Sequence, residues 1–296
     1  MLESAVRRVL DESHRPRCYY RVTVKKRLLA LFCIAFTSGC GSVFHTVAPI
    51  PSSSVLRAND VNGVSTWAVL PTSYDPQAAA PWIIYNHGFE QEINSILTHF
   101  PQSLFVQDLV KAGFIVVASD YRNLACWGDA ECAEDLANLQ TLWHSKLNLT
   151  PQPFVIGESM GGIVTWNAIS HGTLKPLAVV GIYPVCNLAA MFANQVFAPS
   201  IQAAYGFTSQ ADYLAATSGF DPVLTPPAKF VAIPIQIWAS YSDHSVVRSQ
   251  NEDVFAREVN AAGGKVIIHT SQGDHGDASN FDASAVTSFF RADPGL

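Results

Sequence analysis

The stretch Phe154-Val-Ile-Gly-Glu-Ser-Met-Gly-Gly162 joins a run of strand-forming residues to an apolar segment that can continue as a helix. Its centre has the pattern G-x-S-x-G. Between a strand and a helix, this pattern makes a turn so sharp that small residues are needed two positions either side of the serine. The helix that follows presents free backbone N–H groups to a developing negative charge. The stretch therefore predicts a nucleophilic Ser159, with Gly157 and Gly161 permitting the turn.

The rest of the chain alternates between strand-like and helix-like segments. Several strand-like runs are continuously apolar, which is typical of strands buried on both faces of a parallel sheet. This alternation predicts an α/β fold with a mostly parallel, doubly wound sheet and helices on both faces. The expected strands span residues 64–70, 82–86, 114–119, 154–157, 177–183, 235–239 and 265–270, and the expected helices span about 102–112, 133–147, 160–170, 246–262 and 282–291.

Residues 186–226 interrupt the alternation, because aromatic residues stand there among small ones before a Pro-containing end. We interpret them as a small helical cap; the alternative is a plain crossover helix with long loops. The predicted organisation is an N-terminal extension and signal segment at 1–40, a tether at 41–61 and a catalytic domain at 62–296.

The residues that follow the strands are candidates for the rest of a site, since active groups in open α/β sheets lie beyond the carboxyl ends of the strands. His87, Gly88 and Phe89 follow the strand at 82–86. A tight turn there directs the Phe89 N–H over the site, where it forms a two-donor oxyanion hole with the Met160 N–H. We expect His87 to brace this loop and not to transfer a proton.

The acid of the site is predicted at Asp243, the first carboxylate after the strand at 235–239. Asp253 is the alternative, but it falls inside the next expected helix. His244 adjoins Asp243, and an immediate neighbour points elsewhere, so we interpret it as structural.

The base is predicted at His275, which lies in a glycine-flanked loop after the last expected strand. His269 lies within that strand and is the weaker candidate. The chain order serine, acid, histidine is the order that sheets of this kind use.

These residues resemble the α/β-hydrolase superfamily, over about residues 62–291. The dienelactone hydrolase and prolyl-oligopeptidase-like branches look most similar, by the compact body and small cap. The resemblance implies an α/β-hydrolase fold and serine hydrolase chemistry, but no particular substrate. It is carried by His87-Gly88-Phe89, Gly157-Glu-Ser159-Met-Gly161, Asp120-Tyr-Arg122, Asp243 and His275.

Three functions are compatible with these residues. The first is a serine esterase for small-molecule esters with small to medium acyl groups, in which His275 activates Ser159 and Asp243 orients the imidazole. It requires no metal and no organic cofactor. The second is a serine peptidase or amidase of the prolyl-oligopeptidase-like branch, and the third is a non-catalytic surface lipoprotein.

The N-terminal segment has the features of a secretory signal. Lys25-Lys26-Arg27 precede a short apolar run at 28–36, and small residues around Cys40 follow. The ending at Gly-Cys resembles a bacterial lipoprotein lipobox, although Thr37 departs from the usual aliphatic residue. We expect an exported, extracytoplasmic protein held at a membrane by a lipid on Cys40; the alternative is an ordinary signal cut nearby.

Charge and cysteines restrict the partners and the compartment. Residues 1–40 carry a net charge of +5, and the remaining residues a net of −11, which repels phosphate and disfavours a nucleic-acid partner. An oxidising compartment permits disulfides, and Cys126 and Cys132 can close a short loop that contains a glycine. Cys186 is left over as a buried small hydrophobe. No His/Cys set with zinc-ligand spacing accompanies them, so no metal site is predicted.

Overall fold

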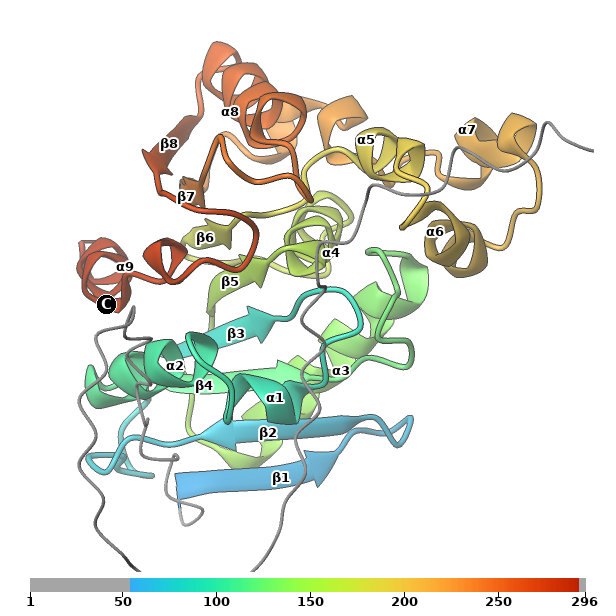
Figure 1. Ribbon diagram of the computed structural model, residues 1–296. Helices are drawn as coiled ribbons and strands as arrows, with labels where there is room; N and C mark the ends of the chain where they lie inside the picture. The colour runs from blue at the N-terminus through green and yellow to red at the C-terminus, as the bar shows by residue number, and fades with distance from the viewer. Residues whose placement is uncertain (1–53, 293–296) are drawn as a thin grey trace, which may run out of the picture. The chain divides into compact units, whose positions relative to one another are not determined.

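The computed structural model describes residues 54–292, which are organised around one eight-stranded sheet (Figure 1). The strand order is β1-β2-β4-β3-β5-β6-β7-β8. The first two strands join the sheet by antiparallel pairing, and all other neighbours are parallel. The strands are β1 (Val55–Asn59), β2 (Ser65–Val69), β3 (Trp82–Asn86), β4 (Ile115–Ser119), β5 (Phe154–Glu158), β6 (Val179–Ile182), β7 (Pro234–Ala239) and β8 (Lys265–Thr270).

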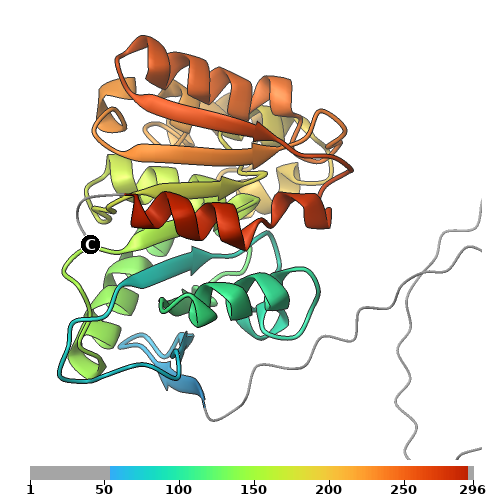
Figure 2. The same ribbon diagram turned by 90° about the vertical axis from the view of Figure 1, so that its left-hand side faces the viewer.

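Helices cover both faces of this sheet. On one face, α2 (Gln102–Lys111) and α9 (Ala283–Arg291) share a buried cluster with the strands; both lie in front of the sheet in Figure 2. On the other face, α3 (Ala130–Lys146), α4 (Met160–Ser170) and α8 (Glu252–Ala261) contribute to a second buried cluster. The prediction of a mostly parallel, doubly wound sheet is therefore confirmed.

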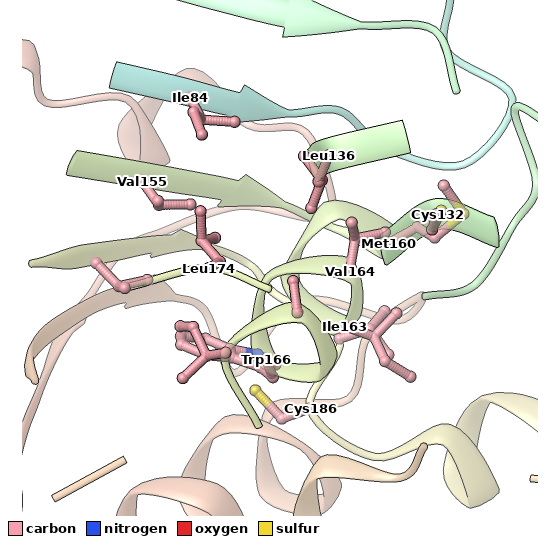
Figure 3. Packing of buried hydrophobic residues seen from close by; sticks show 14 of the residues in the cluster. Ile84, Cys132, Leu136, Val155, Met160, Ile163, Val164, Trp166, Leu174 and Cys186 are labelled. Atoms are coloured by element: carbon pink, nitrogen blue, oxygen red, sulfur yellow. The ribbon is translucent and has the colours of Figure 1, made fainter. Parts of the chain in front are cut away.

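The helix α4 lies in the middle of the second cluster, and all its residues are buried. Figure 3 shows Val164 and Trp166 of this helix among side chains of the sheet, of α3 and of the segment after β6. A helix that is apolar all round is stable only where protein surrounds it. This packing holds the N-terminus of α4 rigidly at the carboxyl end of β5.

Residues 186–226 lie beyond the carboxyl ends of the strands as a group of short helices (Figure 1). The helical cap that the sequence predicts is therefore present, and a single long crossover helix is not what this segment forms. Its helices are α5 (Leu188–Ala193), α6 (Ala198–Tyr205) and α7 (Tyr213–Ala216), with 3₁₀ turns at Gln210–Asp212 and Pro222–Leu224.

Three elements differ from the expectations. The strand β1 falls inside residues 41–61, which were expected to be a tether, because its mostly exposed side chains give no burial pattern and backbone pairing with β2 holds it. The helix expected over 246–262 begins only at Glu252, because Arg248–Gln250 forms a 3₁₀ turn. A short helix, α1 (Ile93–Ile96), was also not expected.

The N-terminal predictions concern another part of the chain. The signal segment and Cys40 lie outside residues 54–292. Within those residues, no helix combines the length and the apolar character needed to cross a bilayer.

A buried acid at the start of α8 is expected to link stability to pH. Glu252 is fully buried, and burial raises the pKa of its carboxyl well above the ordinary value, with Asp243 adding to the rise. In the unfolded chain a glutamate ionises above about pH 4.3. The folded protein keeps this proton to higher pH, so the free energy of unfolding should fall as pH rises from about 4.3 toward the folded pKa.

Glu252→Gln, which is neutral at every pH, should lack this part of the pH dependence. Urea unfolding of both proteins at pH 5 and pH 8 measures it. We expect the variant to be more stable relative to the wild type at pH 8 than at pH 5. An equal difference at both pH values would contradict the assignment.

Candidate active site

Ser159 occupies the turn between β5 and α4 in a backbone conformation that side chains rarely adopt. Its φ is 52° and its ψ is −119°. Such a conformation costs on the order of 1–3 kcal/mol and persists only where the surroundings hold it. The Ser159 N–H donates to the carbonyl of Ile182 over 3.0 Å, and its own carbonyl accepts from the N–H groups of Gly162 at 2.9 Å and Val185 at 2.8 Å. These bonds hold the strained turn from both sides.

Glycines allow the chain to approach this turn closely. A Cβ atom on Gly161 would collide with the Asn86 carbonyl at the end of β3, and one on Gly157 would lie 2.8 Å from the Gly161 carbonyl oxygen. A Cβ atom on Gly88 would lie 3.4 Å from the Cβ of Ser159. The loop after β3 therefore lies directly against the serine, as the sequence predicts for a site built from both segments.

The structure brings Ser159, His275 and Asp243 into one hydrogen-bonded line. The Ser159 Oγ lies 3.0 Å from the His275 Nε2, and the His275 Nδ1 lies 2.8 Å from the Asp243 Oδ2. With the proton on Nδ1, the imidazole donates to the carboxylate and accepts from the serine hydroxyl. This arrangement can remove the proton from Ser159 as its oxygen attacks an electrophile.

Asp243 is held in place by the loop after β7. Its side chain is 3% exposed, against 25% for His275. The Oδ1 atom accepts from the backbone N–H groups of Ser245 at 2.8 Å and Val246 at 2.9 Å. These bonds leave Oδ2 free to accept from the imidazole, so the carboxylate is oriented before any substrate binds.

The alternative residues all have other partners. Asp253 pairs with the Arg248 guanidinium at 3.0 Å, and His244 pairs with Asp274 at 3.3 Å on the surface. His269 stacks on the ring of Trp238, with centroids 4.4 Å apart. None of these hydrogen-bonds to Ser159.

The backbone N–H groups of Phe89 and Met160 are available to a ligand. Among residues 54–292, neither group has a hydrogen-bond acceptor. On either side of Phe89, the Gly88 N–H donates to the Gln91 side chain at 3.0 Å, and the Glu90 N–H donates to the Leu124 carbonyl at 3.0 Å. The loop is thus fixed around a free donor, which is what an oxyanion hole requires.

His87 lies behind this loop. It is completely buried, and its Nδ1 lies 2.7 Å from the Gly88 carbonyl oxygen. Burial lowers the pKa of the imidazole, so the neutral ring is favoured at neutral pH. These contacts place His87 against the loop, and its bracing role stays a prediction.

Three aromatic rings next to the site were not singled out from the sequence as a group. Phe89, Trp127 and Phe197 touch one another, with ring centroids 5.4–5.5 Å apart. They come from the loop after β3, the loop before α3 and the cap. Trp127 also donates to the Ser200 hydroxyl at 2.9 Å. We call this trio the aromatic wall. The sequence places Phe197 among the aromatic residues of the cap, Phe89 in the oxyanion loop and Trp127 between two cysteines, but it does not bring the three together.

Cys126 and Cys132 form a disulfide, as expected, and Cys186 is a buried free thiol. The bridge closes the loop that carries Trp127, whose φ is 49°. The Asp129 carboxylate and both sulfur atoms lie within 4.8 Å of one another, forming a group of possible metal ligands within residues 54–292. Sulfur atoms in a disulfide carry no thiolate for a metal, and Asp129 instead caps α3.

Mass spectrometry of the non-reduced protein should find Cys126 and Cys132 linked and Cys186 free. Replacing both by serine should lower the free energy of unfolding by about 2 kcal/mol at most, because a short loop restrains little chain entropy. Loosening of the Trp127 loop should accompany this, seen as a change in tryptophan fluorescence. Two free thiols at these positions would contradict the prediction.

The sequence matches no protein-family model and no curated protein. Solved structures share the fold. An acylaminoacyl peptidase from Pyrococcus horikoshii superposes with a TM-score of 0.63 at 14% identity, over 81% of this chain and 41% of that chain. A puromycin-hydrolyzing peptidase from Mycobacterium tuberculosis gives 0.61 at 16% identity, over 81% and 40%. A fungal esterase structure from Rhizomucor miehei gives 0.60 at 17% identity, over 81% and 84%.

The chain spans less than half the length of the two peptidases. Identities this low show a shared fold. The likeness confirms the predicted fold class, a doubly wound sheet with helices on both faces and a small cap.

Proposed function

We propose that this chain, which has the α/β-hydrolase fold, is a serine hydrolase that cleaves carboxylic esters of small to medium acyl groups. The observation that carries the proposal is the line of hydrogen bonds from Ser159 through His275 to Asp243. A strained serine beside a free pair of N–H donors adds to it. Packing without a catalytic role does not explain why a loop histidine lies between a serine and a buried carboxylate.

The proposed reaction follows from the positions of these groups. His275 takes the proton from the Ser159 Oγ as that oxygen attacks the ester carbonyl. The N–H groups of Phe89 and Met160 stabilise the oxyanion, while Asp243 stabilises the imidazolium. His275 then returns the proton to the leaving alkoxide, and water cleaves the acyl-enzyme with His275 again as base.

The aromatic wall supports a preference for apolar acyl groups. Phe89, whose N–H we assign to the oxyanion hole, belongs to this wall, and its ring contacts Trp127 and Phe197. We therefore expect an acyl chain bound at the oxyanion hole to pack on the wall. Each buried methylene contributes about 0.8 kcal/mol. Phe197 belongs to the short cap, so we expect the cap to limit the length of the acyl chain that fits beside the wall.

An ester and not a peptide is the proposed substrate. The fungal esterase is matched over 84% of its length, whereas the matched peptidases have more than half their length outside the superposed part. An amine also leaves less readily than an alkoxide, and it requires protonation by His275. The peptidase remains the second candidate, because peptidases share the fold.

A series of p-nitrophenyl esters of increasing acyl length, measured beside peptide anilides, tests the proposal. Turnover should rise with chain length, reach a maximum at short to medium esters and fall for long ones. Phe197→Ala should shift this maximum toward longer chains. A peptide anilide cleaved as fast as the best ester would favour the peptidase.

We also propose that the protein is exported and held at a membrane through Cys40. The signal-like segment supports this, and the disulfide agrees with an oxidising compartment. A fatty-acid analogue should label the wild type and not Cys40→Ser. Equal labelling of both would argue against the anchor.

A further inference from the structure

The residue before the nucleophile carries a buried carboxylate that the reaction above does not use. Glu158 is 3% exposed and accepts three hydrogen bonds. Its Oε1 accepts from the Tyr183 hydroxyl at 2.6 Å and from the Gln102 amide at 2.8 Å, and its Oε2 accepts from the Tyr85 hydroxyl at 2.5 Å. A buried carboxylate is costly unless it is hydrogen-bonded, and this one is satisfied on both oxygens.

The two tyrosines act as donors to this carboxylate. Burial, together with the nearby Glu158, raises the pKa of Tyr85 and of Tyr183 well above the ordinary value. Both hydroxyls therefore keep their protons at neutral pH. The donors come from three elements, since Tyr85 lies in β3, Gln102 begins α2 and Tyr183 directly follows β6.

Tyr183 connects this carboxylate to the base. Its ring lies against the His275 ring, with centroids 4.4 Å apart and planes at 57°. The Tyr183 backbone has a φ of 36°, and its N–H donates to the Trp238 carbonyl at 2.8 Å. Phe281 packs on the same tyrosine ring at 5.8 Å. The tyrosine is thus fixed at its backbone, its ring and its hydroxyl.

His275 needs such a support, because it lies in a loop. Gly273 and Gly276 on either side both have a φ of 81°, and the imidazole is one-quarter exposed. The bonds to Asp243 and Ser159 hold the two ring nitrogens, but they leave the ring plane able to rotate about the line through them. A packed ring beside the imidazole removes that freedom.

We propose that Tyr183, anchored through its hydroxyl to Glu158, is a positioning residue that holds the His275 imidazole in line between Ser159 and Asp243. The inference rests on the proposed serine hydrolase function. Small displacements of a reacting group are costly, since an error of about 1 Å can lower a rate by about 10²-fold. The carboxylate beside the nucleophile thereby acts on the base without touching the substrate.

The chain offers a matched control for this role. Tyr183→Phe and Tyr85→Phe each remove one hydroxyl from the same carboxylate, but Tyr183 is the one whose ring lies against His275. Tyr183→Leu removes the aromatic ring as well. For each variant, kcat, KM, the pH profile of kcat/KM and urea unfolding are measured with the best p-nitrophenyl ester.

We expect Tyr183→Leu to lower kcat by about 10- to 100-fold with KM within about twofold of the wild type. Tyr183→Phe should lower kcat by a smaller factor, and Tyr85→Phe should leave it within about twofold. The pH at which kcat/KM reaches half its maximum should shift in Tyr183→Leu and not in Tyr85→Phe, because the surroundings of His275 change only in the first.

Two results would overturn the inference. One is a Tyr183→Leu protein with kcat within twofold of the wild type. The other is an equal loss of kcat in Tyr183→Phe and Tyr85→Phe that follows their loss of stability, which would make the Glu158 cluster structural only. Should Tyr183→Leu fail to fold, the comparison of the two phenylalanine variants decides. A wild type that cleaves no ester would instead contradict the proposed function.

Discussion

Ser159→Ala is expected to reduce ester turnover by about 10⁴- to 10⁶-fold. The variant lacks the Oγ atom that lies 3.0 Å from the His275 Nε2, so no acyl-enzyme can form. The N–H donors and the binding surface remain, and they account for the residual rate. The fold should persist, because alanine keeps the backbone hydrogen bonds of the turn.

A matched control for this change lies at the far end of the helix that follows Ser159. Ser170, at the end of α4, is also largely buried, and its hydroxyl donates to the Asn167 carbonyl at 3.0 Å. Ser170→Ala should therefore retain turnover within a few-fold. Initial rates on the best ester and far-UV circular dichroism of both variants make the comparison. Near-normal turnover by pure Ser159→Ala would mean that the nucleophile lies elsewhere.

Asp243→Asn is expected to lower kcat by about 10³- to 10⁴-fold. The asparagine keeps the Oδ1 acceptor for Ser245 and Val246, so the loop should stay in place. Its NH₂ group would face the His275 Nδ1, which disfavours the tautomer that accepts from Ser159. The amide also cannot stabilise an imidazolium.

Asp253→Asn serves as the control for the acid. It weakens the pair with Arg248, in which the aspartate side chain is 30% exposed. The Arg248 guanidinium keeps its bonds to the Ala239 carbonyl and the Thr270 hydroxyl. Activity should stay within a few-fold of the wild type. If Asp253→Asn were the more damaging change, the acid would be wrongly assigned.

Much of the fold follows from local features of the chain. Continuous apolar runs such as 154–157 predict strands buried on both faces, and the structure places them in the central sheet. The turn at Ser159 is also local, because two small residues within a few positions decide whether the chain can bend there. Edge elements carry no such signal, so the sequence does not distinguish β1 from the tether expected at 41–61.

For contacts between distant residues, the sequence offered several candidates and allowed only a preference among them. Ser159 and His275 are 116 residues apart, and the choice of His275 over His269 rested on the order of strands and loops. The structure separates the two histidines, because one ring reaches the serine and the other stacks on Trp238.

The sequence by itself determined most strands of the sheet and the sharp turn, because each depends on residues close together along the chain. The chain order of the three polar residues is also read directly from it. Tertiary structure alone decided which groups surround them. Tyr183 lies against His275, and Trp127 lies against Phe89, because the loops after separate strands converge at one edge of the sheet. Glu158 was unremarkable in the sequence for the same reason, since its three donors lie 25 to 73 residues away and meet it only when the chain packs.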